Sequence, residues 1–259
     1  MKVVLLGAGN VATHLGIALQ KAKHAVVQVY SRNERSAKEL SKKLSCGFTT
    51  DIKKISNEAG IYIIAIKDDE IKNLSLPLSK REGMKNKILV HTSGSLPMNI
   101  FRNTSQINVG VFYPLQTFSK NRAIDLSNIP ICIEANNKPT EKKLLALART
   151  ISKNVHIINS GKRKTLHVAA VFANNFTNHL YAVAEDILKK EKLSFDILKP
   201  LIQETVDKIK NSSPSKMQTG PAIRGDKKII KEHLSFLSSS PLHRKIYKLL
   251  TESINKARE

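Results

Sequence analysis

The sequence is poor in aromatic residues and in cysteine, and tryptophan is absent. No stretch approaches the ~18 consecutive apolar residues of a membrane-spanning helix, so no membrane span is expected. Cys46 and Cys132 lie far apart without the spacing of metal ligands. We therefore expect two reduced thiols, a cytoplasmic protein and no metal site. The N-terminus has the pattern of a strand rather than the charged and apolar regions of a signal peptide.

Acidic residues are also scarce. The chain has 21 Asp and Glu compared with 43 Lys and Arg, which gives a formal net charge of +22. A basic balance attracts nucleic acids, anionic membranes or phosphorylated ligands. Lys and Arg outnumber the acids in both halves of the chain, and no basic block carries interleaved aromatic residues. A nucleic-acid partner is therefore not expected. The excess charge is typical of a solvated, lysine-rich surface that helps to gather an anionic cofactor and substrate.

The start of the chain carries the most informative pattern, a short apolar run followed by Gly-x-Gly-x-x-Ala and a segment of helical period. Gly7 permits a tight strand-to-helix turn, Gly9 lets the backbone approach a pyrophosphate, and Ala12 allows the helix to pack closely. The helix N-terminus offers free N–H groups to phosphates. Small residues also fill ordinary tight turns, but this context favours a dinucleotide site. Its predicted cofactor-binding residues are Gly7, Gly9, Asn10 and Val11.

The end of the second predicted strand indicates which dinucleotide would bind. An acid at this place would bind the ribose 2′-hydroxyl of NAD, whereas an arginine accommodates the 2′-phosphate of NADP. The chain has Ser31 and Arg32 here and no acid. A hydroxyl and a guanidinium can hold a phosphate. The alternative is a serine that caps a helix beside a solvated arginine, but the sequence favours NADP over NAD.

Apolar runs and helical segments then alternate with short connections. The runs predict strands near residues 24–30, 47–49, 61–66, 87–90, 108–112, 129–134 and 155–158. This alternation predicts an α/β fold with a doubly wound, parallel Rossmann sheet. After Gly161 only helices are predicted. We therefore expect an NADP-binding Rossmann domain at 1–160 and an all-helical domain for substrate binding and dimerisation at 161–259.

Ligands of open α/β sheets bind beyond the carboxyl ends of the strands. Four segments should therefore surround one crevice: Gly7–Asn10, Ile66–Asp68, His91–Ser95 and Tyr113–Thr117. Ile66 is a further cofactor-binding candidate. His91 is a candidate proton donor and Ser93 a second polar contact to substrate. The alternative is a histidine that caps backbone groups and a serine that serves the turn.

A long, largely apolar helix is predicted from about Arg163 to Lys190, with polar residues at helical spacing. These polar residues should fall close to one side: His167, Asn174, Asn178, Tyr181 and Glu185. Asparagines are costly to bury without partners, so the stripe faces either a polar cleft or hydrogen-bonding groups of another helix. The cleft is the favoured interpretation, with Asn174 and Asn175 near the substrate.

A turn beginning at Thr219-Gly220-Pro221 is a third candidate. It offers backbone N–H groups, a hydroxyl and the guanidinium of Arg224 to an anion. The alternative is a helix start in which Asp226 pairs with Arg224. In the first interpretation, Thr219, Gly220 and Arg224 bind the carboxylate of a substrate.

Together these motifs resemble the Rossmann-like/DUF2520 family, whose members are described as NADP oxidoreductases. The resemblance rests on Gly7–Ala12, His91–Ser95, Tyr113–Ser119, His167-x6-Asn174-Asn175 and Thr219–Asp226, and it spans essentially the whole chain. The family is similar to pyrroline-5-carboxylate reductases, ketopantoate reductases and β-hydroxyacid dehydrogenases. That similarity implies a Rossmann domain joined to a helical, often dimerising domain.

The chain departs from these relatives at two places. β-Hydroxyacid dehydrogenases carry a lysine one turn before the asparagine pair, where this chain has Val171 and no lysine nearer than Lys164. We infer that His167 replaces this lysine as the proton donor, a role that the resemblance itself does not imply. Relatives commonly show His-Pro-Leu where this chain has a tyrosine, Tyr113, so a histidine is not required at that point.

The sequence thus predicts an NADP-dependent oxidoreductase that transfers hydride between NADPH and a small carbonyl or imine acid. A ketopantoate-like 2-keto acid is the first expectation and a pyrroline-carboxylate-like imine the second, both by analogy. The predicted catalytic residues are His167, Asn175, Ser93 and His91. The alternative, which the missing lysine favours, is a non-catalytic protein that senses NADP. A homodimer through the helical domain is expected in either case.

Overall fold

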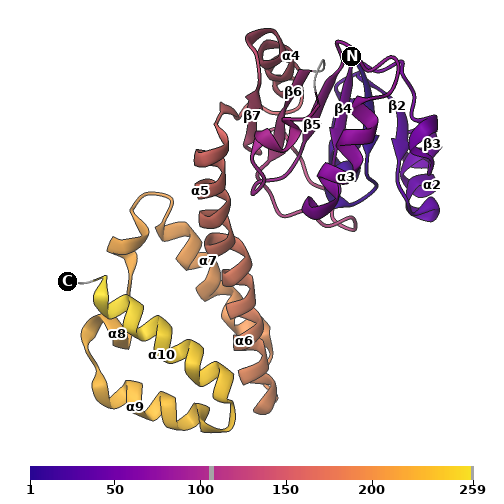
Figure 1. Ribbon diagram of the computed structural model, residues 1–259. Helices are drawn as coiled ribbons and strands as arrows, with labels where there is room; N and C mark the ends of the chain where they lie inside the picture. Colours follow the sequence, from indigo (N-terminus) through magenta and orange to yellow (C-terminus); the bar gives the residue numbers. More distant parts are fainter. Residues whose placement is uncertain (105–107, 258–259) are drawn as a thin grey trace. The chain divides into compact units, whose positions relative to one another are not determined.

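The computed structural model describes residues 1–104 and 108–257 and divides into two compact units. The first unit comprises Met1–Asn174 and the second begins at Asn175. The strands drawn in Figure 1 belong to the first unit, whereas the elements after α5 and α6 are helical. An α/β domain followed by a helical domain is confirmed.

Among the described residues, eight strands form one sheet in the order β3-β2-β1-β4-β5-β6-β7-β8. Their bounds are β1 Lys2–Leu6, β2 Ala25–Tyr30, β3 Gly47–Thr49, β4 Ile61–Ile64, β5 Ile88–His91, β6 Asn108–Pro114, β7 Ile131–Ala135 and β8 Val155–Ile157. The order reverses beside β1, with β2 on one side and β4 on the other. Ligands of doubly wound sheets bind at such a switch point.

The sheet is not parallel throughout, because β6 and β7 pair antiparallel. Parallel neighbours need a crossover, which is usually a helix. The described chain between Pro114 and Ile131 contains no helix, so it turns back along the edge of β6 instead. The expectation of an all-parallel sheet is therefore wrong at this one pairing, while β7 and β8 are again parallel.

Both faces of the sheet are buried. Alternate residues of β1 serve two cores, with Val3 and Leu5 in one and Val4 and Leu6 in the other. A strand buried on both faces reads as a continuous apolar run, which is why β1 was recognisable in the sequence. The α-helices of this region are α1 Asn10–Lys21, α2 Glu34–Lys43, α3 Asp68–Ser79 and α4 Lys138–Arg149, with 3₁₀ turns at Ile52–Lys54 and Met98–Phe101.

The long helical segment is not one regular α-helix. It comprises α5 Ser160–Ala170, a π-helical stretch Val171–Phe176 and α6 Thr177–Lys190. The π-helical stretch contains Asn174 and Asn175, and π-helical turns are rare and frequently lie at functional sites. Because i→i+5 bonding changes the residue register, the single polar stripe predicted from α-helical spacing does not continue from His167 into α6.

The predicted change to helix at residue 161 agrees with the start of α5 at Ser160. The two compact units nevertheless divide later, within the π-helical stretch. Side chains of α5 explain the difference: Arg163 contacts Leu96 and Glu134, and His167 contacts Tyr113, so α5 packs as part of the first unit.

The second unit exposes an unusual amount of apolar surface. Its remaining α-helices are α7 Lys199–Lys208, α8 Pro221–Arg224, α9 Lys227–Phe236 and α10 Pro241–Lys256, with 3₁₀ turns at Phe195–Leu198, Pro214–Met217 and Leu237–Ser239. Of its described hydrophobic residues only Ala222 and Leu237 are buried, whereas Leu201 and Leu249 are 65% and 67% exposed. Within residues 1–104 and 108–257, no helix has the length and apolar character needed to cross a membrane.

Candidate functional site

A cavity of about 840 Å³ lies in the first unit, at the carboxyl ends of β1, β2, β4, β5 and β6. The residues predicted to bind a cofactor all line it: Gly7, Gly9, Asn10, Val11, Ser31, Arg32 and Ile66. Of the predicted catalytic residues, Ser93 and His167 line it. A cavity of this size is typical of small-molecule and cofactor sites.

The turn between β1 and α1 has the backbone that its glycines require. Gly7 has a φ of +129°, and a Cβ there would lie 2.2 Å from the Ala65 carbonyl oxygen, so no other residue fits. Gly9 differs, because a Cβ built on it meets nothing within 4 Å. Gly9 is the N-cap of α1. No side chain caps this end of the helix, and its first turn contains no acidic residue. The cavity therefore faces an open helix N-terminus, which is suited to a phosphate.

The predicted 2′-phosphate site lies at the end of β2, the strand that pairs with β1. The Arg32 guanidinium donates a hydrogen bond from Nη1 to Glu70 Oε2 at 3.0 Å. The helix cap at this place is Asn33, whose side chain accepts the Ser36 N–H, so Ser31 is not the cap of α2. The Ser31 hydroxyl accepts the Asn33 N–H and lines the cavity. A hydroxyl and a guanidinium thus meet here, together with an acid that the sequence pattern did not reveal.

His91 lies beneath the cavity rather than in it. Its side chain is 0% exposed, contacts the Phe101 ring and is absent from the cavity lining. Its Nδ1 accepts the Ser93 N–H at 3.1 Å. Burial, assisted by the charge of Arg163, lowers the pKa of His91 to about 3, so the imidazole is neutral near pH 7. These contacts favour the alternative considered for His91, in which its imidazole supports the loop after β5 by accepting a backbone N–H.

The Ser93 hydroxyl is committed to its own loop. It donates to Asp68 Oδ2 at 2.7 Å and accepts the N–H groups of Ser95 and Leu96. The first turn of α3 is thereby tied to the loop after β5. Asp68 thus has a specific partner 25 residues away in the sequence.

A tyrosine and a histidine meet where β6 ends. Tyr113 Oη and His167 Nδ1 lie 3.0 Å apart and share a hydrogen bond. A Cβ on Gly94 would lie 2.5 Å from His167 Nδ1 and 2.8 Å from Tyr113 Cζ, so glycine makes room for the pair. Burial raises the pKa of Tyr113 to about 12, although the charge of Arg163 acts in the opposite direction. The phenol therefore retains its proton at neutral pH.

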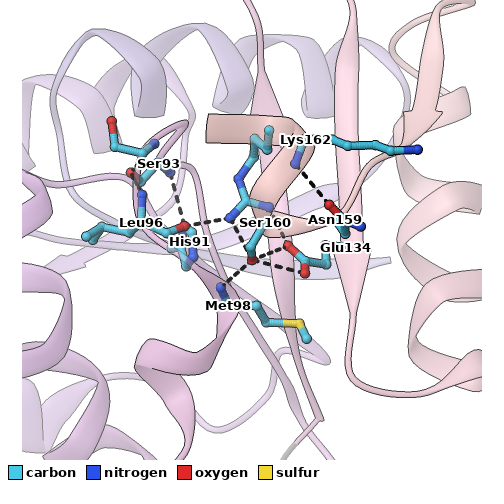
Figure 2. A network of polar contacts seen from close by, with 10 residues as sticks. His91, Ser93, Leu96, Met98, Glu134, Asn159, Ser160 and Lys162 are labelled. Atoms are coloured by element: carbon cyan, nitrogen blue, oxygen red, sulfur yellow. Dashed lines mark hydrogen bonds and ion pairs between the residues drawn. The ribbon is translucent and has the colours of Figure 1, made fainter. Parts of the chain in front are cut away.

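A buried ion pair holds the start of α5, and it was not among the features predicted from the sequence. Arg163 is 1% exposed and pairs with Glu134 at the end of β7. Arg163 Nη2 also donates to the Leu96 carbonyl at 2.5 Å. Figure 2 shows Ser160 between Glu134 and Met98, where its hydroxyl donates to the carboxylate and accepts the Met98 N–H at 2.9 Å. These contacts fix α5, and with it His167, against the loop after β5.

The remaining candidates do not line this cavity. Asn174 and Asn175 are exposed residues of the π-helical stretch. Thr219, Gly220 and Arg224 belong to the second unit, where the Arg224 guanidinium pairs with Asp226 at 2.7 Å. That ion pair is the alternative considered from the sequence. The described residues include no group of three or more His, Cys, Asp or Glu side chains placed to hold a metal ion.

Comparisons with known proteins agree with this architecture of a Rossmann-type domain joined to a helical domain. Residues 1–111 match the model of a Rossmann-like domain, and residues 129–254 match the domain of unknown function DUF2520. No curated protein matches the chain.

Solved structures resemble the chain over its whole length. A Bacteroides fragilis protein named "putative NADP oxidoreductase" is 44% identical, with 98% of each chain covered and a TM-score of 0.92. An imine reductase of Myxococcus stipitatus in complex with NADP+ is 15% identical, with 99% of this chain and 94% of that chain covered and a TM-score of 0.70. A Plasmodium falciparum pyrroline carboxylate reductase with NADP bound is 13% identical, with 100% and 98% covered and a TM-score of 0.63. The chain belongs to the Rossmann-like/DUF2520 family, as its motifs predicted.

Proposed function

We propose that the protein is an NADP-dependent oxidoreductase that transfers hydride between NADPH and a small carbonyl or imine acid. The observation that carries the proposal is the cavity at the strand ends. It contains an open glycine turn at its centre, Ser31 and Arg32 on one side of β1, and Tyr113 and His167 on the other. This is the order in which a dinucleotide presents its ribose phosphate, its pyrophosphate and its reactive ring.

The residues present fit such a cofactor. Gly7 supplies a turn that any Cβ would block, and the space at Gly9 leaves room for a pyrophosphate against the first turn of α1. Ser31 and Arg32 would hold the 2′-phosphate. Apolar side chains of Ile52, Ile66 and Leu74 line the same cavity and would suit an adenine ring. When bound, NADPH supplies the hydride.

The tyrosine–histidine pair is the proposed source of the proton. The Tyr113 phenol keeps its proton at neutral pH and gives it to the oxygen or nitrogen of the reduced double bond. His167 returns a proton from Nδ1 to the phenolate, and its half-buried ring then regains one from water. Ser93 is proposed to position Asp68 and the loop after β5 rather than to react, because its hydroxyl already has three partners.

Substrate binding is proposed for Asn174 and Asn175 of the π-helical stretch and, separately, for Thr219, Gly220 and Arg224 at the turn in the second unit. Two of the solved structures named above are reductases of imines or of pyrroline carboxylate, which supports testing cyclic imine acids before 2-keto acids. This order reverses the one expected from the sequence.

Consumption of NADPH, followed by its absorbance, tests the proposal with panels of cyclic imine acids and 2-keto acids. We expect turnover with at least one panel member and a large loss of kcat on Tyr113→Phe. If NADPH binds tightly and no member of either panel is reduced, the proposed substrate classes are wrong.

A second candidate function is a non-catalytic NADP sensor. The observation that favours it concerns α5, which contributes only His167 to the described lining of the cavity. No lysine of α5 lies in that described lining. A sensor would bind NADPH without turnover, and Tyr113→Phe would leave cofactor binding and signalling unchanged.

A homodimer through the helical unit is also proposed. The described helices α6, α7, α9 and α10 contain no buried residue, and large apolar side chains such as Phe236 and Leu242 are more than half exposed. Monomeric proteins rarely expose so much apolar surface. Sedimentation of the purified protein should give twice the monomer mass of 28.8 kDa.

A further inference from the structure

An acid from a distant part of the chain lies beside the arginine of the proposed 2′-phosphate site. Glu70 is 38 residues from Arg32, in the first turn of α3, yet its Oε2 accepts the Arg32 Nη1 hydrogen bond at 3.0 Å. Both side chains line the cavity. The Glu70 side chain is 33% exposed and that of Arg32 is 70% exposed, so the pair is open to solvent and to a ligand.

The stability of the fold does not explain why Arg32 and Glu70 form an ion pair. Solvent-exposed ion pairs contribute little to folding. The first turn of α3 already carries Asp68 and Asp69, which complement the positive end of the helix without Glu70. The carboxylate instead occupies the guanidinium face that a bound phosphate would use.

We propose that Glu70 sets the discrimination between NADPH and NADH by competing with the 2′-phosphate for Arg32. The inference rests on the proposed function, which places the adenosine ribose at this end of the cavity. A phosphate monoester carries a charge of about −2 near neutral pH, so a neighbouring carboxylate both repels it and retains its arginine. A ribose 2′-hydroxyl is uncharged and can donate a hydrogen bond to the same carboxylate.

Glu70 therefore supplies, from α3, the acid that is missing at the end of β2. The protein therefore prefers NADPH over NADH less strongly than it would with Ser31 and Arg32 alone. At a separation of about 5 Å in a solvated site, the repulsion between one carboxylate and a dianion, screened by salt at physiological ionic strength, corresponds to a factor of about 5 in affinity.

The test measures dissociation constants of NADPH and NADH for the full chain by calorimetric titration. The variant is Glu70→Gln, which keeps the shape and removes the charge. The matched control is Glu39→Gln, which removes the same charge from the Arg35–Glu39 ion pair on α2, outside the cavity lining. Thermal melts without cofactor check that both variants fold.

For Glu70→Gln we expect NADPH to bind about fivefold more tightly, while NADH binding is unchanged or weaker. For Glu39→Gln we expect changes below twofold for both cofactors. Tight NADPH binding that Glu70→Gln leaves unchanged, or equal tightening of NADH, would overturn the inference alone. If the wild-type protein binds neither cofactor, the proposed function fails and the inference fails with it.

Discussion

The buried pair of Arg163 and Glu134 permits a quantitative test of how α5 is held. Glu134→Gln preserves the size of the side chain but leaves the guanidinium, which is 1% exposed, without its counter-charge. Removing one partner of a buried ion pair typically costs about 3–5 kcal/mol. The glutamine oxygen can still accept a hydrogen bond, so we expect a loss near the lower end, about 3 kcal/mol in the free energy of unfolding.

Chemical denaturation followed by far-UV circular dichroism measures this loss. Because removing both charges leaves no buried charge without a partner, the double variant Arg163→Met with Glu134→Gln should recover most of the stability. Glu58→Gln is the matched control, since its pair with Lys2 is exposed to solvent and its loss should leave the free energy of unfolding nearly unchanged. A loss below about 1 kcal/mol for Glu134→Gln, or no recovery in the double variant, would refute the reasoning.

Two further predictions concern the site. Tyr113→Phe should lower kcat about 100-fold or more and leave the NADPH dissociation constant within twofold, because general acids typically contribute this much; an unchanged kcat would exclude the phenol as proton donor. His91 has a folded-state pKa of about 3, well below the value of 6.5 expected when unfolded, so the unfolded state binds the additional proton between these limits. The free energy of unfolding should therefore fall by about 1 kcal/mol per pH unit as the pH decreases from 6 to 4, and His91→Gln should show a smaller slope; equal slopes would contradict the burial argument.

The sequence predicted those features that depend on neighbouring residues. The turn at Gly7 and Gly9 and the strand bounds of β3 follow from local glycine and apolar patterns. The resemblance to the DUF2520 family was confirmed because several such local motifs occur in one order along the chain.

Features that depend on residues far apart in the sequence could not be predicted from local patterns. Glu70 meets Arg32, and Glu134 meets Arg163, across many residues of intervening chain. The burial of His91 follows from the packing of Phe101 and the loop after β5, which no spacing rule describes. An isolated acid at the end of an apolar strand, such as Glu134, was the one available signal of a buried partner.

Cofactor binding by Gly9→Ala tests the central claim most directly. The backbone at Gly9 is extended and a Cβ there meets no protein atom within 4 Å, so the substitution should leave the folded protein intact while filling space reserved for a pyrophosphate. Gly60→Ala is the control, because its Cβ also meets nothing and Gly60 does not line the cavity. We predict tight NADPH binding by the wild type and Gly60→Ala, and a loss of about tenfold or more for Gly9→Ala with an unchanged melting temperature of the free protein. Equal NADPH affinity of all three proteins, or no binding by the wild type, would contradict a dinucleotide site at this turn.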